Sequence, residues 1–414
     1  MIKESRKVLV LAGGVPQIEL IKQLRARGFY TILADGNKNA VAAPFADSFF
    51  CVQIFDIEAV KELAQTENVS FIMTVCADQV LLVAAQVSEM LGLPFYIDYK
   101  TALDVSDKER MKRVFWENDI PTSKYFKVEK PDDPALSQLK YPLIVKPVDA
   151  YSSRGVRKAL NGSDLKQFFA EAKQISRTGG VIVEEYCPGE EISVDAFIIN
   201  GKAHVLCVTN SDKILDDGRF VIFRGRHPAD ISEETRESIQ KVAQQITDAF
   251  GLANAPLLIQ MINNNGHVSV LEFCARTGGN MKWLLIKYSS GVDVISATID
   301  LFIGNSPDIT PVVPTHKIVV NDFIYGKPGT FDHVEGFSEF LSNGMLNEYY
   351  VIRPKGFCVA GVRSSSDRLV GINIVADSID EFNYKQKRVT ENVKILDETG
   401  NDIMRHDLFS DLPQ

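Results

Sequence analysis

One stretch of the chain constrains its fold and its ligand more than any other. Residues 181–195 consist of an apolar run, an acidic and aromatic connector, a turn, and a second, alternating run. The two runs predict two strands. In the connector, backbone groups and Glu184 can meet the edge of an adenine ring, and Glu191 can reach the two hydroxyls of a ribose. The order of these residues therefore indicates a site for an adenine nucleotide.

Two further strands supply what such a site would still lack. Residues 143–147 place Lys146 at the end of an apolar run, and residues 270–276 place Glu272 and Arg276 on one face of another strand, because alternate side chains point the same way. A lysine that points into a core needs an anion, which is either a phosphate or a structural carboxylate. A lysine for the phosphates and a carboxylate for a metal ion, beside residues that hold the adenine, make an ATP site without a P-loop.

Composition narrows the classes of protein to consider. The chain has 414 residues, enough for two to four subdomains, and a net charge of −9 without a basic block, which disfavours nucleic acid as a partner. The apolar run at residues 8–11 is too short for a signal peptide or a membrane span. The six cysteines contain no CxxC pair, so we expect free thiols in the cytoplasm.

The first hundred residues alternate between strand and helix patterns, which predicts a parallel sheet covered on both faces. Ligands of such sheets bind at the carboxyl ends of the strands, where Gly13, Gly14, Asp35 and Asp78 lie. The glycine pair lacks the full dinucleotide fingerprint. It serves either a tight turn or a substrate.

The rest of the chain reads as α+β segments. We expect a small lobe over residues 141–195, strands and a helix (232–250) up to residue 303, and a β-rich end with Gly-rich turns. We also expect one helix over residues 101–117, which carries Lys108, and one helix from about 281 to 302.

Gln260 and Glu272 lie on strands joined by a turn at residues 263–266, and a hairpin there would put both side chains on one face. Glu272 suits a magnesium ion bound with ATP, although it could instead pair with Arg276. Gln260 is a poor magnesium ligand because it is neutral, and Cys274 is a worse one because it is soft.

The remaining candidates surround these strands. Small residues at 149–156 would let backbone N–H groups approach phosphate oxygens and could close as a lid, or form an ordinary turn. Arg276 offers a fork of donors to phosphoryl oxygens, and Gly278 and Gly279 allow close approach to a substrate. Arg224 and Arg226 form either a solvated loop or a clamp for a substrate carboxylate.

With these residues together, the chain resembles the ATP-grasp enzymes over nearly its whole length. The residues that match the motifs of that family are Lys108, Lys146, Ser153, Gly155, Glu184, Glu185, Tyr186, Cys187, Glu191, Glu272 and Arg276. The chain departs from the usual pattern at Ser152, Gln260 and Cys274. The resemblance implies an ATP-grasp fold with α/β and α+β parts: a pre-ATP-grasp domain (1–118), a small lobe (119–195), a large lobe with the metal site (196–305) and a β-rich C-terminal domain (306–414).

The resemblance also implies an activity. ATP-grasp ligases activate a carboxylate as an acyl phosphate, which an amine then attacks, with release of ADP and phosphate. The ending at residues 276–279 is similar to that of carboxylate–amine ligases such as the bacterial L-amino acid ligases. ATP and Mg²⁺ (or Mn²⁺) are the implied cofactors. Glu272 and Arg276 are the implied catalytic residues, Glu272 and Gln260 the metal ligands, and small carboxylates and amines the substrates.

Alternatives stay open at this point. The chain could resemble the carbamoyl-phosphate synthase or purine-biosynthesis branches, although it contains only one ATP-grasp unit. Gln260 and Cys274 also motivate a nucleotide-binding protein with impaired catalysis. The sequence also leaves a homodimer open. It does not identify the substrates, because loops rather than the motif residues bind them.

Overall fold

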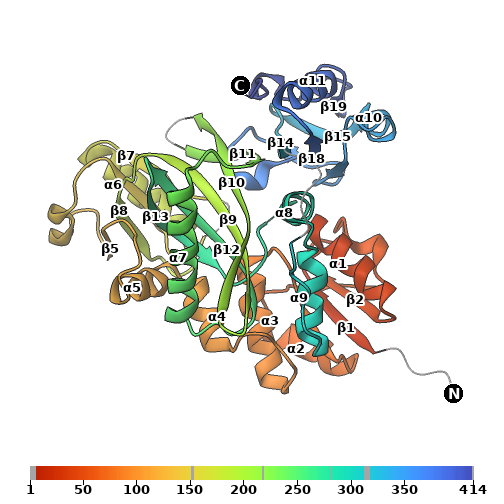
Figure 1. The fold of residues 1–414 in the computed structure, drawn as a ribbon, viewed down its shortest axis with the longest axis horizontal. Coiled ribbons are helices and arrows are strands. Elements are labelled where there is room, and N and C mark those ends of the chain that lie inside the picture. Colours follow the sequence, from red (N-terminus) through yellow and green to blue (C-terminus); the bar gives the residue numbers. More distant parts are fainter. Residues whose placement is uncertain (1–5, 151–152, 217–218, 280, 312–317, 413–414) are drawn as a thin grey trace.

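The computed structural model describes residues 6–150, 153–216, 219–279, 281–311 and 318–412. Figure 1 shows a red and orange N-terminal part, a central part with the longest strands, and a blue C-terminal part beside them. The mixture of a parallel sheet with large antiparallel sheets confirms the predicted α/β and α+β class.

The N-terminal part is a parallel sheet of β1 (Lys7–Leu11), β2 (Tyr30–Asp35), β3 (Ser48–Cys51) and β4 (Phe71–Met73), in the order β3-β2-β1-β4. Its helices are α1 (Val15–Ala26), α2 (Ile57–Thr66) and α3 (Asp78–Leu91). Successive side chains of β1 are buried on opposite faces of the sheet, in two different core clusters. This is why the strands are continuous apolar runs, as expected for a covered parallel sheet.

The single helix predicted over residues 101–117 is wrong. The structure has two helices there, α4 (Tyr99–Ser106) and α5 (Lys108–Glu117). Asp107 between them has extended backbone (ψ 116°), and its side chain accepts hydrogen bonds from the backbone N–H of Glu109 at 2.9 Å and of Arg110 at 3.0 Å. An N-cap carboxylate of this kind ends one helix and starts the next. As a result, Lys108 is the first residue of α5.

The small lobe has an antiparallel sheet in the order β5-β8-β6-β7. Its elements are β5 (Tyr125–Val128), β6 (Leu143–Pro147), β7 (Arg157–Ala159), α6 (Gly162–Ile175) and β8 (Val181–Glu185). Leu165, Phe168, Phe169 and Ala172 of α6 pack on the sheet. The helix therefore covers one face, and the other is left for the site.

One antiparallel sheet of eight strands joins the central and C-terminal parts, in the order β13-β12-β9-β10-β11-β14-β18-β16. Its strands are β9 (Glu190–Ile199), β10 (Lys202–Asp216), β11 (Arg219–His227), β12 (Ala255–Asn264), β13 (His267–Cys274), β14 (Ile318–Ile324), β16 (Glu348–Val351) and β18 (Val370–Ala376). Because β11 pairs with β14, hydrogen bonds cross the predicted domain boundary at residue 305.

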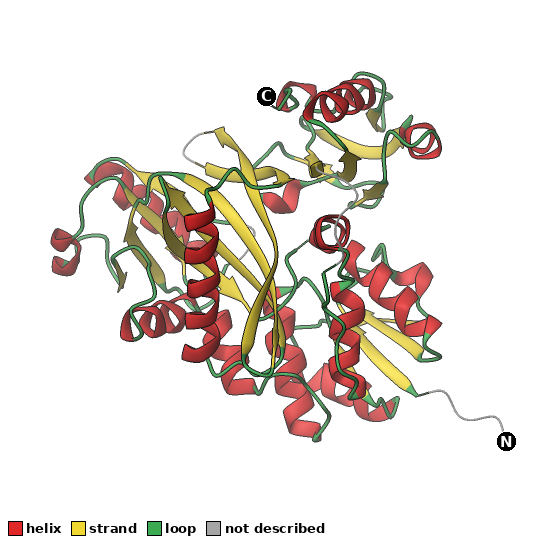
Figure 2. Cartoon of the chain, viewed as in Figure 1, coloured by secondary structure: helices red, strands yellow, loops and turns green. Residues whose placement is uncertain are grey.

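One face of this sheet packs against a helix, and the other face carries candidate site residues. Ile192 and Val194 of β9 share a core cluster with Ile239 and Ala243 of α7 (Glu233–Ala249), which lies along the sheet in Figure 2. The alternate side chains of β9 therefore lie on the opposite face. Those side chains include Glu191.

The single helix predicted from 281 to 302 is also two helices, α8 (Lys282–Ser290) and α9 (Val294–Ile303). Gly291 ends α8 in the left-handed conformation (φ 77°), and Asp293 caps α9 by accepting from the Ser296 backbone N–H at 3.0 Å. A left-handed residue cannot continue an α-helix, so the pattern breaks there.

The C-terminal part is β-rich, as predicted, with a three-stranded sheet in addition to its share of the large one. Its further elements are β15 (Gly329–Glu335), β17 (Cys358–Val359), β19 (Lys394–Asp397), α10 (Phe337–Ser342) and α11 (Ile379–Thr390). Short 3₁₀ turns lie at Ala43–Phe45, Pro134–Gln138, Ser365–Asp367 and His406–Leu408. None of the helices that the structure describes is long and apolar enough to span a bilayer.

Candidate active site

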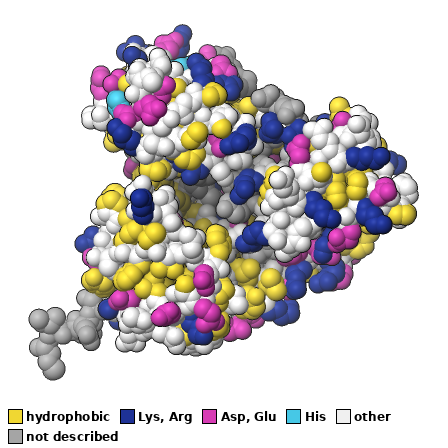
Figure 3. Space-filling view, turned by 180° about the vertical axis from the view of Figure 1, so that it is seen from behind, with side chains coloured by type: hydrophobic (Ala, Val, Ile, Leu, Met, Phe, Trp, Pro, Cys, Tyr) yellow, Lys and Arg dark blue, Asp and Glu magenta, His cyan; other side chains and the backbone are white. Residues whose placement is uncertain are grey.

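Two neighbouring clefts contain most of the predicted site residues. The first, the lobe cleft, lies between the small lobe and the large sheet, and Lys146, Glu184, Tyr186, Glu191, Lys213 and Glu272 are among its lining. The second, the central cleft, is lined by residues of the N-terminal, central and C-terminal parts, among them Asp78, Ser193, Arg276, Lys282, Asn321 and Arg368. Figure 3 shows the molecule hollowed between its three masses, with lysine and arginine side chains around the hollow.

A buried ion cluster forms one wall of the lobe cleft. Glu184 lies 2.6 Å from Lys146 Nζ and 2.7 Å from Lys112 Nζ, and it accepts a hydrogen bond from Ser123 at 3.0 Å. Burial raises the pKa of Glu184, but the two lysine charges outweigh burial and lower that pKa to about 2. Burial lowers the pKa of Lys112 to about 8.

The structural-carboxylate interpretation of Lys146 therefore holds in part, because Glu184 is its counter-ion. Two lysines share this one carboxylate, which leaves a positive charge at the cleft wall. That charge favours a phosphate ligand. Glu184 lines the lobe cleft, and its carboxylate pairs with the two lysines. Its contact with an adenine edge stays a prediction. Lys112 was missed, although its spacing of four from Lys108 places both on one face of a helix.

The connector after β8 supplies an aromatic wall. The Tyr186 ring stacks with that of Phe220, with centroids 6.4 Å apart, and Lys158 Nζ lies 3.6 Å from the Tyr186 centroid. Glu185 Oε1 accepts from the Lys140 backbone N–H at 2.9 Å, and Cys187 also lines the cleft. A flat apolar and aromatic wall of this kind suits a planar ring.

Glu191 lies on the same wall and has two partners. Lys213 Nζ is 2.5 Å from Glu191 Oε2, and Gln260 Nε2 donates to Glu191 Oε1 at 3.0 Å. Lys213 is a cation of the lobe cleft that the sequence analysis missed. The one signal that could have found it was alternation along β10, which puts Thr209, Ser211 and Lys213 on one face.

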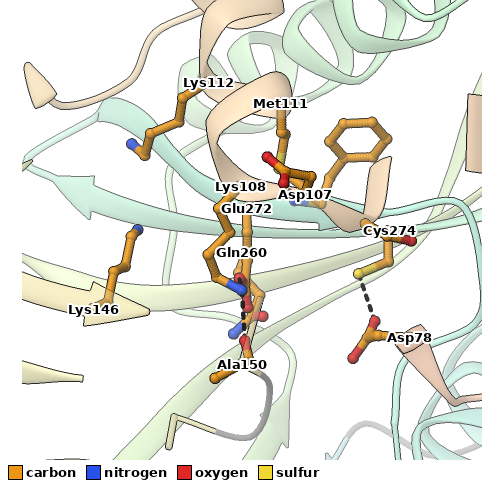
Figure 4. Close-up of polar contacts among 12 residues, drawn as sticks. Asp78, Asp107, Lys108, Met111, Lys112, Lys146, Ala150, Gln260, Glu272 and Cys274 are labelled. Carbon is orange, nitrogen blue, oxygen red and sulfur yellow. Dashed lines mark hydrogen bonds and ion pairs between the residues drawn. The ribbon is translucent and has the colours of Figure 1, made fainter. Parts of the chain in front are cut away.

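Gln260 and Glu272 are opposite each other on β12 and β13, so the predicted hairpin and shared face are confirmed. Glu272 Oε2 lies 3.0 Å from Lys108 Nζ, which also donates to the Ala150 carbonyl at 2.8 Å, as Figure 4 shows. Glu272, Gln260 and Ser153 line both clefts. Glu272 therefore stands where the two clefts meet.

The N-terminal part reaches this point through Asp78, the first residue of α3. Asp78 Oδ1 accepts from Cys274 Sγ at 2.7 Å and from Arg276 Nε at 2.7 Å, and Arg276 Nη1 donates to the Thr277 carbonyl at 2.7 Å. Burial raises the pKa of Cys274 well above its usual value, so the thiol stays protonated. Asp78 thus fixes the guanidinium of Arg276 in the central cleft, which Glu272 also lines.

The residues present fit a single magnesium ion that arrives with a nucleotide. Such an ion takes one or two protein oxygens and fills its other positions from phosphates and water. Glu272 offers a carboxylate. Gln260 uses its amide nitrogen toward Glu191, and its carbonyl oxygen accepts no hydrogen bond from the part of the chain that the structure describes. Cys274 donates its proton to Asp78 and does not serve as a ligand.

Comparison with known proteins bears on this arrangement. A family model described as the ATP-grasp domain matches residues 139–283, which include Lys146, Glu184, Glu191, Glu272 and Arg276. The chain carries an ATP-grasp domain. The predicted resemblance is thereby confirmed.

The relatives of this ATP-grasp chain have several different activities. The chain is 26% identical over 259 residues to the formate-dependent phosphoribosylglycinamide formyltransferase of Bacillus subtilis, a match that covers 60% of the chain and 65% of the relative. It is 30% identical over 193 residues to the D-alanine–D-alanine ligase of Geobacillus kaustophilus, a match that covers 41% of the chain and 51% of the relative. The matches therefore span less than two thirds of these relatives.

Among solved structures, the L-amino acid ligase from Bacillus licheniformis superposes with a TM-score of 0.78 at 19% identity, over 96% of this chain and 100% of that one. At this level of identity the superposition establishes the ATP-grasp fold. It does not establish the reaction.

Two glycines of the ATP-grasp domain shape the central cleft. A Cβ on Gly278 would lie 2.6 Å from Lys282 Cγ and 2.9 Å from Asp195 Oδ1, so only glycine fits. Lys282 Nζ lies 3.2 Å from Asp195 Oδ2 and donates to Thr209 Oγ1 at 2.5 Å. Gly279 lines the cleft. These contacts fix Lys282 in the lining of the central cleft.

Two residues of the predicted phosphate loop, Tyr151 and Ser152, lie outside the described residues, as does Asn280. Ser153 and Gly155 are described, and both have left-handed backbone, with φ 58° and 73°. A Cβ on Gly155 would come within 2.9 Å of the Ile175 side chain. Ser153 lies at the junction of the clefts with Glu272.

Arg224 and Arg226, predicted as a solvated loop or a substrate clamp, lie on β11, and each pairs with a carboxylate of the protein. Arg224 is buried, with its Nε 2.6 Å from Asp322 Oδ1, and Arg226 Nε lies 3.3 Å from Asp212. Neither arginine is among the described residues that line the lobe cleft or the central cleft, whereas Gly225 between them lines the central cleft. The register explains this, because Gly225 lies opposite Ser211 on the cleft face and its neighbours point to the other face.

Proposed function

We propose that this ATP-grasp protein is an ADP-forming ligase. It activates a small carboxylate as an acyl phosphate, which an amine then attacks to form an amide or peptide bond. The observation that carries the proposal is the position of Glu272 at the junction of the lobe cleft and the central cleft. A nucleotide in the first cleft and a carboxylate in the second would meet there.

The nucleotide would lie with its ring along Tyr186 and its phosphates toward Lys146, Lys213 and Lys108. Magnesium, held by Glu272 and the Gln260 carbonyl, would neutralise charge on the phosphates. The protein's own work is positioning and charge stabilisation, since phosphoryl transfer needs little covalent help. Arg276, oriented by Asp78, presents donors to the transferred group.

The reaction balances in two steps. A carboxylate oxygen of the first substrate attacks the γ-phosphorus, and the bond to the β–γ bridging oxygen breaks, which releases ADP. The amine nitrogen then attacks the acyl carbon, phosphate leaves with the C–O bonding pair, and the amine loses a proton. The relative named D-alanine–D-alanine ligase supports the joining of a carboxylate to an amine.

A second candidate is a nucleotide-binding protein with impaired catalysis. Cys274 is committed to Asp78 and the amide nitrogen of Gln260 to Glu191, which leaves Glu272 as the carboxylate of the metal site. A purine-biosynthesis reaction is a third interpretation of the same geometry, supported by the formyltransferase relative. The acceptor amine distinguishes it from a peptide ligase.

The test is phosphate release from ATP with panels of amino acids, small carboxylates including formate, and amines including glycinamide ribonucleotide. We expect release that depends on one carboxylate and one amine, with the amide product identified by mass spectrometry. ATP binding without substrate-dependent release across all panels would favour the impaired binder. A homodimer and a cytoplasmic location stay predictions.

A further inference from the structure

Arg368 differs from the other deeply buried arginines around the site. Its exposed fraction is 5%. Arg224 has Asp322 as its counter-ion, and Arg276 has Asp78. Within the described ranges, no aspartate or glutamate forms an ion pair with Arg368. A buried charge without a counter-ion is costly, so its retention calls for an anionic ligand.

The guanidinium of Arg368 is fixed in the wall of the central cleft. Its Nε donates to Tyr325 Oη at 3.1 Å, its Nη2 donates to the Ile222 carbonyl at 2.8 Å, and its carbon lies 3.7 Å from the centroid of the Phe323 ring. Ile222 and Phe323 both line the cleft. Nη1 has no acceptor in the described part of the chain, and a guanidinium carries five N–H donors. Donors are therefore left for a ligand.

The charge balance of the cleft singles out the same residue. Lys282 lies 3.2 Å from Asp195, and Arg276 donates to Asp78. These two cations are each neutralised by a carboxylate, and Arg368 is not. The excess is one positive charge beside the apolar Phe323, which matches one carboxylate better than a phosphate dianion.

The position of Arg368 separates it from the carboxylate that would be phosphorylated. Its hydrogen-bond acceptor Ile222 is on β11, whereas Gln260 is on β12. The sheet order from β12 through β9 and β10 to β11 contains three strand spacings. That amounts to about 14 Å along the sheet. One carboxylate cannot reach both ends of this distance.

We propose that Arg368 forms a carboxylate-binding subsite, and that the amine acceptor therefore carries a carboxylate of its own. The proposal rests on the ligase function proposed above and narrows its acceptor to amino acids and related zwitterions. The acceptor carboxylate would pair with the free edge of Arg368. Its amine would then point back along the cleft toward Glu272.

The test compares each amino acid acceptor with its uncharged amide in the wild type, Arg368→Gln and Arg368→Lys. Arg363→Gln is the matched control, because Arg363 is an exposed arginine of the same segment outside the central cleft. We expect the wild type and the control to prefer the free acid at least tenfold in kcat/KM. Arg368→Gln should raise KM for the free acid tenfold or more, with little change in kcat, and should lose the preference. Arg368→Lys should fall between.

A binding measurement separates this proposal from the ligase function. Thermal shifts by the same amino acids, their amides and inorganic phosphate are recorded with a non-hydrolysable ATP analogue present. Stabilisation of the wild type but not of Arg368→Gln by the free acids supports the subsite even when no turnover is found. Turnover with equal use of acid and amide overturns the subsite and leaves the ligase. Stabilisation by phosphate alone, or by none of the probes, also overturns it. If Arg368→Gln does not fold, Arg368→Lys carries the comparison.

Discussion

At the scale of single residues, Glu272 is predicted to be the carboxylate that binds the metal ion. It is opposite Gln260, beside Lys108, and at the junction of the clefts. Glu272→Gln removes the negative charge that would hold the metal but keeps the shape. We expect substrate-dependent phosphate release to fall at least a hundredfold, on the order of 3 kcal/mol in the barrier. The melting temperature should change little, because the side chain is 31% exposed.

Cys274→Ser is the control for this prediction. A serine hydroxyl can donate to Asp78 as the thiol does, so activity should stay within about threefold of the wild type. A large loss in Cys274→Ser, or full activity in Glu272→Gln, would contradict the metal site as drawn.

Gln260→Glu is the complementary change. It replaces the amide that donates to Glu191 at 3.0 Å with a second carboxylate, so two like charges would face each other. We expect the variant to be less stable than the wild type without metal and to gain more from magnesium and a nucleotide analogue. Melting temperatures with and without Mg²⁺ measure this. Equal gains in both proteins would show that Gln260 does not face the metal.

At the scale of elements, one carboxylate near the end of β8 joins this strand to α5 and β6 by ion pairs. Glu184 is the shared counter-ion of Lys112 on α5 and Lys146 on β6, both nearly fully buried. Glu184→Gln leaves both without a counter-ion, and we expect a loss of about 3–5 kcal/mol in the free energy of unfolding at pH 7. Glu185→Gln, one residue along, should cost less than about 1 kcal/mol because that side chain is only half-buried. Urea titration compares the two, and equal losses would contradict the assignment.

The same cluster predicts a pH dependence. The pKa of Glu184 is about 2 in the fold, below its ordinary value of 4.5. Its contribution to stability is therefore fully present above about pH 4.5 and is lost as the pH falls toward 2. Lys112 acts in the opposite sense: its pKa of about 8 lies below the ordinary 10.5, so stability from this group increases between pH 8 and 10.5. Urea unfolding across both windows, compared with Glu184→Gln and Lys112→Met, tests the signs.

At the scale of the whole molecule, the eight-stranded sheet unites the large lobe with the C-terminal strands in a single structural unit. The Arg224–Asp322 pair joins β11 to β14 and is nearly fully buried, whereas the Arg226–Asp212 pair on β11 and β10 is partly exposed. We expect Asp322→Ala to cost about 3–5 kcal/mol and Asp212→Ala less than about 1 kcal/mol. Urea unfolding followed by two probes should show a shared transition. Separate transitions for the large lobe and the C-terminal strands would contradict this coupling.

The sequence by itself determined most of the elements and which of them carry the candidate site residues. Local patterns sufficed for the strands that carry Lys146, Glu191 and Glu272, because alternation and turn residues are read within a few positions. They also sufficed for the hairpin that carries Gln260 and Glu272, but not for its register. A bulge between Gln260 and Met261 places Gln260 opposite Glu272, where the turn alone would place Leu271. The two predictions of a single helix failed because a capping aspartate in one segment and a left-handed glycine in the other interrupt the apolar period.

Only the tertiary structure decided which charges meet and which face the ligand. Arg224 and Gly225 are adjacent, and the pairing of β11 with β10 and β14 puts the glycine in the cleft and the arginine behind it. Asp78 reaches Arg276, and Lys112 reaches Glu184, across long stretches of chain. Arg368 stands out only once the partners of the other buried arginines are known. Such contacts depend on how separate elements pack, which no local pattern encodes, because the energy of a charge depends on its surroundings in space.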